Sequence, residues 1–387
     1  MKKIDYDFEK FIKLSNEEKL NLVAQNQKNP EVFKQEMKAY RFSDASLQEK
    51  LEQLSVNTLS NFHLPYGVAP NFLVDGNTYH IPMVTEERGV LEAASRAAAF
   101  WYDHGGFQTE DMATAKRGYI HLIWSGDTGT LESLYNQFVE ELKAKNFNIS
   151  KDQSDQGMKI AETWLSDMTN EMDHYHLFGF SFETGNDMGA DFINSFLDKT
   201  AREFKNYTEK QEPGKLEILM AVLSNYTPGS YVTMKVECPV DVLGEIHPSM
   251  DGKRFAEKFQ KAVQVGKYSV SRAVTNNKGI MNGIDAVLMA TGNDFRAVEA
   301  GSHAYSIVKG KPESLSDCQV SDGTFTFRIT IPIALGTESQ VTRLHPLASR
   351  SLDILGHPSV KDLMKIAAAV GLASNFGGIT SLITANV

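Results

Sequence analysis

The sequence predicts an α+β fold in which a small β-α-β-β-α-β unit is inserted into a large domain of mixed helices and strands. The chain has 387 residues, which is long enough for two or three domains of ordinary size. Strand and helix periods alternate in a recognisable order between residues 115 and 223. Further strands and helices lie on both sides of that stretch, so the smaller unit interrupts the larger one.

The composition is that of a globular protein, with 42% hydrophobic and 23% charged residues. The net charge of −10 repels phosphate backbones, and no basic patch offsets it, so we expect no nucleic-acid partner. Two cysteines exclude a disulfide framework and a four-thiolate metal site. The charged residues at 1–11 are unlike a signal peptide, so we expect a cytoplasmic protein.

The first elements, between residues 5 and 60, are predicted to be helices. Ser15 and Glu18 have the spacing of a capping box, and Pro30 is typical of the first turn of a helix. Residues 47–54 carry a third apolar stripe. We expect these helices to form an accessory or oligomerising layer.

A hairpin and a longer helix are predicted next. Asp75 and Gly76 lie between two apolar runs within residues 64–82, the pattern of a tight hairpin turn. A helix is then predicted from near Thr85 to the glycines at 105 and 106.

The stretch from 115 to 223 has the element order of a ferredoxin-like split unit of about a hundred residues. Its predicted strands are 118–124, 158–165, 174–182 and 215–224, and its predicted helices are 131–145 and 188–204. After it, strands are predicted at 231–240 and 325–335, and helices at 296–308 and 360–374. We therefore expect a large discontinuous domain, residues 1–112 and 224–387, and a small inserted domain, residues 113–223.

One segment approaches the length of a membrane span, because residues 366–387 contain no Asp, Glu, Lys or Arg. Its many polar and small residues leave too little hydrophobicity for a span and suit close helix packing. We expect a helix packed inside the protein, and no membrane partner.

The densest group of chemically capable residues lies between Lys278 and Gly301. Glycines bracket a lysine and an aspartate among apolar residues there, which predicts polar groups in a partly dry, tightly turned site. A dry lysine beside a carboxylate stabilises a developing oxyanion. The alternative interpretation is a structural ion pair at helix ends.

Two other segments carry weaker indications of a functional site. Glu86 and Glu87 begin the predicted helix near 85, where the helix dipole favours acidic residues whatever their role. Gly185 and Gly189 flank a strand-to-helix turn whose free N–H groups would suit a pyrophosphate, although the aspartates in that turn oppose an anion.

Neither histidine spacing nor cysteine context indicates a further site. His174 and His176 share a strand face but have no third ligand, so we expect no metal site. Cys238 and Cys318 have no reactive context, and a small buried residue is the default interpretation of each.

Several long segments resemble 3-hydroxy-3-methylglutaryl-coenzyme A reductases, in their soluble bacterial class II form. The matching text is LPYGVAPNFLVDG, PMVTEE, NNKGIMNGIDAVLMATGNDFRAVEAGSHAY, LHPLASRSLDILG and IAAAVGLASNF. The resemblance implies an NAD(P)H-dependent oxidoreductase of the mevalonate pathway and isoprenoid biosynthesis. Such an enzyme reduces hydroxymethylglutaryl-CoA to mevalonate and coenzyme A in two hydride steps, or runs the reverse oxidation.

The resemblance also implies catalytic roles. Glu87, Lys278 and Asp294 match the family's catalytic glutamate, lysine and aspartate. Lys278 would polarise the thioester carbonyl and hold the oxyanion, and Glu87 would protonate the aldehyde oxygen. Asp294 would hydrogen-bond and tune both.

Binding roles follow by the same resemblance. Arg272 and Asn282 match positions that hold the substrate's carboxylate and hydroxyl, and Met188, Gly189 and Asn225 match nicotinamide-cofactor positions in the small domain. The cofactor is NADPH or NADH, which these residues do not distinguish. Because two subunits build each site in this family, a homodimer or a higher assembly is implied.

Two departures from the family pattern leave a second interpretation open. The cofactor turn DAMGAN is changed at 186–191 to NDMGAD, and no histidine follows His357, where the family has a C-terminal flap domain with a proton-donating histidine. The alternative is therefore a catalytically impaired paralogue of the same fold that binds acyl-CoA.

Overall fold

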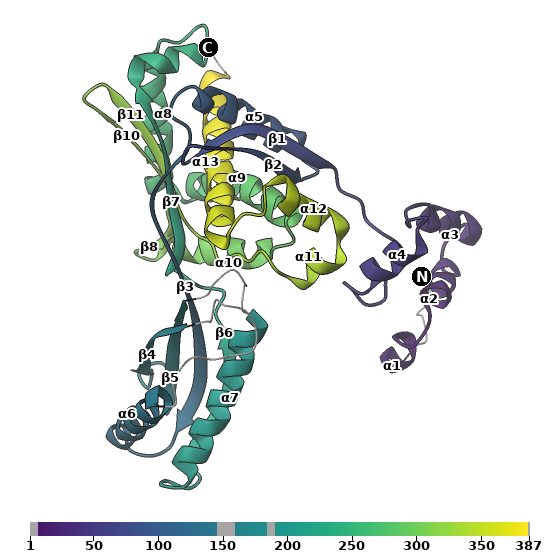
Figure 1. The fold of residues 1–387 in the computed structure, drawn as a ribbon, viewed down its shortest axis with the longest axis vertical. Coiled ribbons are helices and arrows are strands. Elements are labelled where there is room, and N and C mark those ends of the chain that lie inside the picture. The colour runs from purple at the N-terminus through teal and green to yellow at the C-terminus, as the bar shows by residue number, and fades with distance from the viewer. Residues whose placement is uncertain (1–6, 145–158, 184–189, 386–387) are drawn as a thin grey trace.

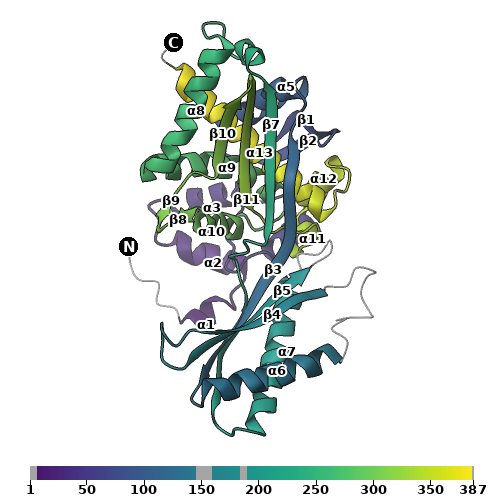
Figure 2. The ribbon, with the colours of Figure 1, turned by 90° about the vertical axis from the view of Figure 1, so that its left-hand side faces the viewer.

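The computed structural model describes residues 7–144, 159–183 and 190–385. They form a helical arm, a large unit and a small unit (Figures 1 and 2). The large and the small unit each combine helices and strands, which confirms the predicted α+β class.

The arm consists of four short helices that project away from the rest of the chain (Figure 1). They are α1 (Phe8–Phe11), α2 (Asn16–Ala24), α3 (Pro30–Ala39) and α4 (Ala45–Glu52). The predicted capping box is present, because the Glu18 N–H donates to the Ser15 hydroxyl and the Ser15 N–H donates to the Glu18 carboxylate. Pro30 opens α3 as predicted. Arg41 ties the arm together by donating to the Leu59 carbonyl at 2.9 Å.

The predicted hairpin is formed by β1 (Tyr66–Val74) and β2 (Asn77–Val84), which pair antiparallel. Asp75 and Gly76 have φ values of 47° and 81°, the left-handed backbone that a two-residue turn of this kind requires. The Asp75 carboxylate also accepts from the Thr109 N–H at 2.8 Å and pairs with Lys365 at 3.0 Å. The turn is thereby fastened to the strand that contains Thr109 and to the helix that contains Lys365.

The longest strand, β3 (Gln108–Trp124), belongs to both units. Its first half pairs with β7 (Ser230–Pro239), which continues to β11 (Thr324–Pro332) and β10 (Ser316–Ser321), all antiparallel. From Ala115 onward it pairs with strands of the small unit. The sequence predicted only residues 118–124 as strand, because residues 108–117 are polar and partly exposed and lack an apolar alternation.

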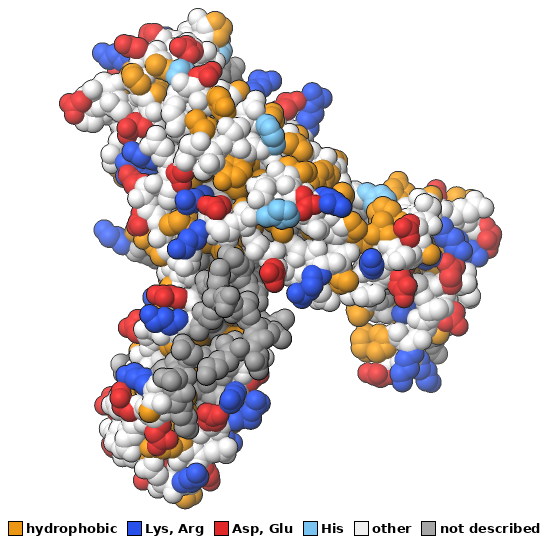
Figure 3. Space-filling view, in the orientation of Figure 1, with side chains coloured by type: hydrophobic (Ala, Val, Ile, Leu, Met, Phe, Trp, Pro, Cys, Tyr) orange, Lys and Arg blue, Asp and Glu red, His pale blue; other side chains and the backbone are white. Residues whose placement is uncertain are grey.

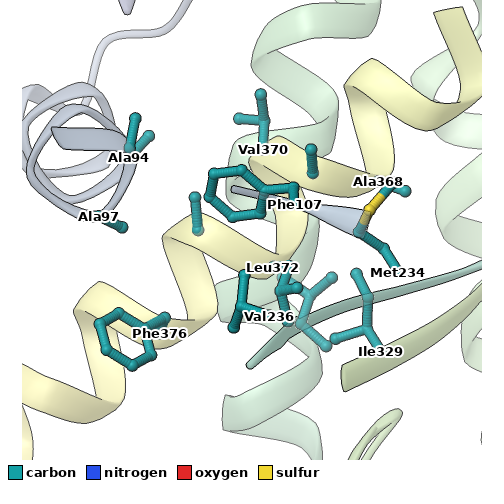
Figure 4. Packing of buried hydrophobic residues seen from close by; sticks show 14 of the residues in the cluster. Ala94, Ala97, Phe107, Met234, Val236, Ile329, Ala368, Val370, Leu372 and Phe376 are labelled. Atoms are coloured by element: carbon teal, nitrogen blue, oxygen red, sulfur yellow. The ribbon is translucent and has the colours of Figure 1, made fainter. Parts of the chain in front are cut away.

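The core of the large unit is built around α13 (Val360–Thr384), which packs against α5 (Arg88–Tyr102), α8 (Gly252–Tyr268), α9 (Val270–Ala290) and β7. Figure 4 shows side chains of α13, α5 and the sheet meeting in this core. The Phe376 ring lies 5.3 Å from the rings of Trp101 and Phe259. By length and composition α13 passes for a membrane-crossing helix, but 72% of its most apolar window is buried in the protein, as predicted for a packed helix.

Gly283 allows α9 and α13 to approach each other closely. A β-carbon at this position would lie 2.3 Å from the Ser374 hydroxyl oxygen and 2.8 Å from the Val370 carbonyl oxygen. We expect Gly283→Ala to lower the free energy of unfolding by about 1–3 kcal/mol, because the added methyl overpacks the contact. Urea unfolding measures this loss.

Gly378→Ala is the matched control for that experiment. Gly378 lies on α13, and a β-carbon added there would have no neighbouring atom within 4 Å. Alanine there is expected to raise stability by up to about 1 kcal/mol, because alanine favours a helix over glycine. An equal loss in both variants would contradict the close-contact explanation.

The small unit follows the predicted order of strands and helices. After β3 come α6 (Thr128–Ala144), β4 (Lys159–Asp167), β5 (Tyr175–Glu183), α7 (Ala190–Glu209) and β6 (Leu216–Leu223). The strands lie in the order β6–β3–β5–β4 and are antiparallel. Both helices contribute to a second hydrophobic cluster, which includes Phe178, Phe180 and Phe204 and is separate from the core around α13.

The remaining elements connect the sheet and helices of the large unit. They are a 3₁₀ helix (Val240–Glu245), α10 (Phe295–Tyr305), β8 (Ile307–Val308), β9 (Lys311–Pro312), α11 (Gln340–Leu344) and α12 (Pro346–Ile354). Among these, α10 is the predicted helix that follows the Lys278 segment.

Candidate active site

Lys278 and Glu87, two of the predicted catalytic residues, meet although they are 191 residues apart in the chain. The Lys278 Nζ lies 3.3 Å from the Glu87 Oε2. Lys278 lies in the middle of α9, and Glu87 is the residue immediately before α5. Because the side chain of Glu87 makes no cap hydrogen bond, its carboxylate is available to the lysine.

The surroundings of this pair differ from the sequence prediction. The side chain of Lys278 is 60% exposed and that of Glu87 is 55% exposed, so the expectation of a dry site is wrong for this chain by itself. The predicted tight turn is present only at Gly292, between α9 and α10, where the backbone is left-handed with φ of 71°. Gly279 and Gly283, which are nearer to Lys278, continue the helix instead.

Asp294, the third predicted catalytic residue, caps the N-terminus of α10. Its carboxylate accepts from the N–H groups of Arg296 and Ala297 at 3.1 and 3.3 Å, and it pairs with the Arg296 guanidinium at 3.3 Å. Within the described residues, no hydrogen bond or ion pair joins Asp294 to Lys278 or Glu87. The chain thus brings together two of the three predicted residues.

The predicted substrate-binding residues lie on the same helix as Lys278. Arg272 is in the first turn of α9, and burial lowers the pKa of its guanidinium, which still remains charged at neutral pH. It donates to the side-chain oxygen of Asn276 at 3.4 Å. Asn282 follows Lys278 by one turn, so their side chains leave the same face of the helix.

A buried asparagine network anchors this part of α9, and the sequence analysis missed it. Asn276 donates to the hydroxyls of Ser314 and Ser316 at 2.7 and 2.9 Å, and the Asn375 amide of α13 donates to Asn276. Asn277 donates to the Glu313 carbonyl at 2.9 Å. The two asparagines before Lys278 could have predicted this network, because asparagine is unfavourable in a helix interior unless its side chain has hydrogen-bond partners.

Of the predicted cofactor-binding residues, Asn225 lines a small cavity between the two units, and Met188 and Gly189 lie outside the described residues. The cavity has a volume of about 40 Å³ and is also lined by Lys116, Thr227 and Gly301. A β-carbon on Gly301 would lie 2.8 Å from the Asn225 carbonyl oxygen, so only glycine lets α10 come this close.

His176 and the two cysteines are buried in the protein. The His176 ring is buried and its Nδ1 lies 3.1 Å from the His174 carbonyl oxygen. The described residues contain no group of three or more side chains arranged to hold a metal ion. Both cysteines are buried and free, and burial raises the pKa of Cys238 to about 12, so this thiol stays protonated.

Comparison with known proteins identifies the family. The family model for hydroxymethylglutaryl-coenzyme A reductase matches residues 15–387. A 3-hydroxy-3-methylglutaryl-coenzyme A reductase of Archaeoglobus fulgidus is 32% identical over 386 residues, which cover 97% of this chain and 83% of the relative. A probable reductase of Borreliella burgdorferi is 28% identical over 90% of this chain and 79% of its own length.

A solved structure supports the same assignment. The class II 3-hydroxy-3-methylglutaryl-CoA reductase from Streptococcus pneumoniae, bound to NADPH in open conformations, superimposes with a TM-score of 0.74. It is 29% identical in sequence, and the match covers 98% of this chain and all of that one. The chain described here therefore belongs to the hydroxymethylglutaryl-coenzyme A reductase family.

Proposed function

We propose that this protein reduces 3-hydroxy-3-methylglutaryl-CoA to mevalonate and coenzyme A in the mevalonate pathway. One turnover consumes two molecules of NADPH or NADH and two protons. The observation that carries the proposal is the contact between Lys278 of α9 and Glu87, the residue before α5, which brings together two of the three predicted catalytic groups. The family match across residues 15–387 and the NADPH described for the Streptococcus pneumoniae structure support it.

The residue roles follow from charge and distance. The Lys278 ammonium donates to the thioester carbonyl oxygen and stabilises the negative charge that develops there during each reduction. Glu87, 3.3 Å away, delivers a proton to the oxygen of the aldehyde intermediate. Asp294 orients these groups in the complete site, and the half-buried Arg272 presents a planar fork to the substrate carboxylate. Asn282 holds the substrate hydroxyl.

The cofactor region fits a polar ligand. Lys116, Asn225 and Thr227 are the residues with long or polar side chains among those that line one small, largely apolar cavity. Its volume suits one polar end of a dinucleotide rather than the whole molecule. When bound, the reduced nicotinamide supplies the hydride. We assign Asn225, with Met188 and Gly189, to holding it.

The same proposal divides the chain into domains. Residues 113–223 form the ferredoxin-like cofactor domain, and residues 1–112 and 224–387 form the domain that binds CoA and substrate. The two separate hydrophobic clusters and the strand order of the small sheet support this division.

Self-association as a homodimer belongs to the proposal as well. The arm and the segment after it expose Phe8, Val56 and Phe62 by 66%, 79% and 90%, which suits burial against a second copy. A partner would also cover the exposed Lys278 and Glu87 and supply the dry surroundings that a single chain lacks. The burial of α13 argues against a membrane span, and together with the charged residues at 1–11 it leads us to assign the enzyme to the cytoplasm.

The test follows the loss of reduced-nicotinamide absorbance when the purified protein, with its ends established by intact mass, meets hydroxymethylglutaryl-CoA. We expect substrate-dependent oxidation of NADPH or NADH, with mevalonate as the product and two nicotinamides oxidised per mevalonate formed. Calorimetric binding of the acyl-CoA with no oxidation of either nicotinamide would instead favour the impaired acyl-CoA-binding paralogue.

A further inference from the structure

Two acidic side chains that have no assigned role meet between α9 and α10. Asp285 of α9 and Glu299 of α10 are partly buried, and their carboxyl groups lie within hydrogen-bonding reach of each other. The Asp285 Oδ1 atom is shielded from solvent and has no hydrogen-bond partner in the part of the chain that the structure describes. This pair lies apart from Glu87 and is not part of the lysine ion pair.

A hydrogen bond between two carboxyl groups requires a proton on one of them, because two carboxylates have no donor and repel each other. The shielded Oδ1 atom decides which group holds the proton. A charge on Asp285 would fall partly on a buried oxygen that no donor stabilises, which is costly. Asp285 is therefore the neutral acid that donates, and Glu299 is the carboxylate that accepts.

The electrostatics agree with this assignment. Burial, together with the neighbouring charge of Glu299, raises the pKa of Asp285 to about 8. Among the described residues on α8, α10, α12 and α13, no lysine, arginine or histidine lowers the pKa of this carboxyl group. The nearby cations are engaged elsewhere, Lys278 with Glu87 and Arg296 with Asp294.

The position of the pair links it to the proposed reaction. Asp285 follows Lys278 by seven residues, two turns further along the same side of α9, and Glu299 follows Asp294 by five residues on α10. Lys278 and Asp294 themselves share no hydrogen bond in the described chain. The carboxyl pair is thus a polar link between the two helices that carry them.

Building on the reductase function proposed above, we propose that Asp285 and Glu299 share one proton and act as a positioning pair, which holds Asp294 of the α10 N-terminus in register with Lys278. Neither residue touches the substrate. The pair works by fixing the angle between two helices, and its loss displaces Asp294 from the position in which it orients Lys278 and Glu87.

The experiment compares the parent with Asp285→Asn and Asp285→Ala. Asparagine has the same shape and still donates to Glu299, so we expect kcat within about twofold of the parent at pH 7. Alanine removes the link, and we expect kcat to fall by about tenfold or more with KM for hydroxymethylglutaryl-CoA nearly unchanged. Glu257→Ala, an exposed acidic position on α8, is the control and should leave both values unchanged.

The pH dependence separates a positioning role from a merely structural one. Above pH 8 the parent loses the shared proton, the two carboxylates repel, and kcat falls. The asparagine variant cannot ionise and keeps its activity at pH 9. Because the folded state raises the pKa of Asp285 above the unfolded value of about 4, stability from this group is complete below about pH 4 and is lost as pH rises to about 8. The melting temperature of Asp285→Asn minus that of the parent should therefore increase as pH rises from about 4 to about 8.

An infrared readout does not depend on turnover. The spectrum of the parent minus that of Asp285→Asn should show the carbonyl band of a protonated carboxylic acid at pH 7, and this band should lose most of its intensity by pH 9. Absence of the band, or identical alkaline activity profiles of the parent and the asparagine variant, would overturn the positioning pair. A parent that shows the band but no turnover would overturn the reductase function and the positioning role of the pair, while the shared proton itself would stand.

Discussion

Replacement of Lys278 by methionine is expected to lower kcat for hydroxymethylglutaryl-CoA reduction by about 10²–10³-fold or more. Methionine keeps the length of the side chain but removes the ammonium that stabilises the developing oxyanion, and loss of one such donor has an effect of this size. The fold should be unaffected, because Lys278 is 60% exposed and its pairing with Glu87 is a surface ion pair worth about 0–1 kcal/mol.

The measurement is steady-state oxidation of reduced nicotinamide, alongside a thermal melt of each variant. Lys261→Met is the matched control, because Lys261 is an exposed lysine on α8, the helix next to α9. The control should retain the activity of the parent. If Lys278→Met and Lys261→Met turn over at equal rates, Lys278 is not the oxyanion-stabilising group.

Replacement of Glu87 by glutamine is expected to have the second-largest effect, a loss of about 10²–10⁴-fold in the reduction of the aldehyde intermediate. Glutamine fills the same space and still reaches Lys278, but it cannot deliver a proton to the aldehyde oxygen. The deficit should appear when mevaldehyde is supplied as the substrate, since that isolates the second hydride step from the first.

Glu86→Gln provides the comparison, because Glu86 is the adjacent acidic residue and the structure records no ion pair between it and Lys278. The Glu86 variant should reduce mevaldehyde at the rate of the parent. A loss shared equally by the two variants would mean that the local negative charge, rather than the proton of Glu87, supports the reaction.

The sequence predicted those parts of the fold that depend on local chemistry. The capping box at Ser15, the start of α3 at Pro30 and the hairpin turn at Asp75 each follow from the conformational preferences of two or three neighbouring residues. The first half of β3 was missed because its pairing with β7, more than a hundred residues later in the chain, makes it a strand despite its polar composition.

The candidate site was predicted less completely, because its surroundings are set by distant segments. The resemblance selected Lys278 and Glu87, and these two side chains do meet. The predicted dry site was wrong because the apolar residues next to Lys278 in the sequence face the core, whereas the lysine points outward from α9. Local composition does not reveal which side of a helix is exposed to solvent. The partner of Asp285 was likewise hidden, since Glu299 becomes its neighbour only when α10 folds back beside α9.

The central position of α13 has a bearing on how the protein is made. This helix fills the core of the large unit, yet its residues, 360–384, leave the ribosome after every other described element. The small unit has its complete hydrophobic cluster once residue 223 has emerged, so it can fold during synthesis. The strands and helices that surround α13 keep their apolar faces uncovered until residues 360–384 have emerged, and uncovered apolar surface of this kind favours aggregation during synthesis.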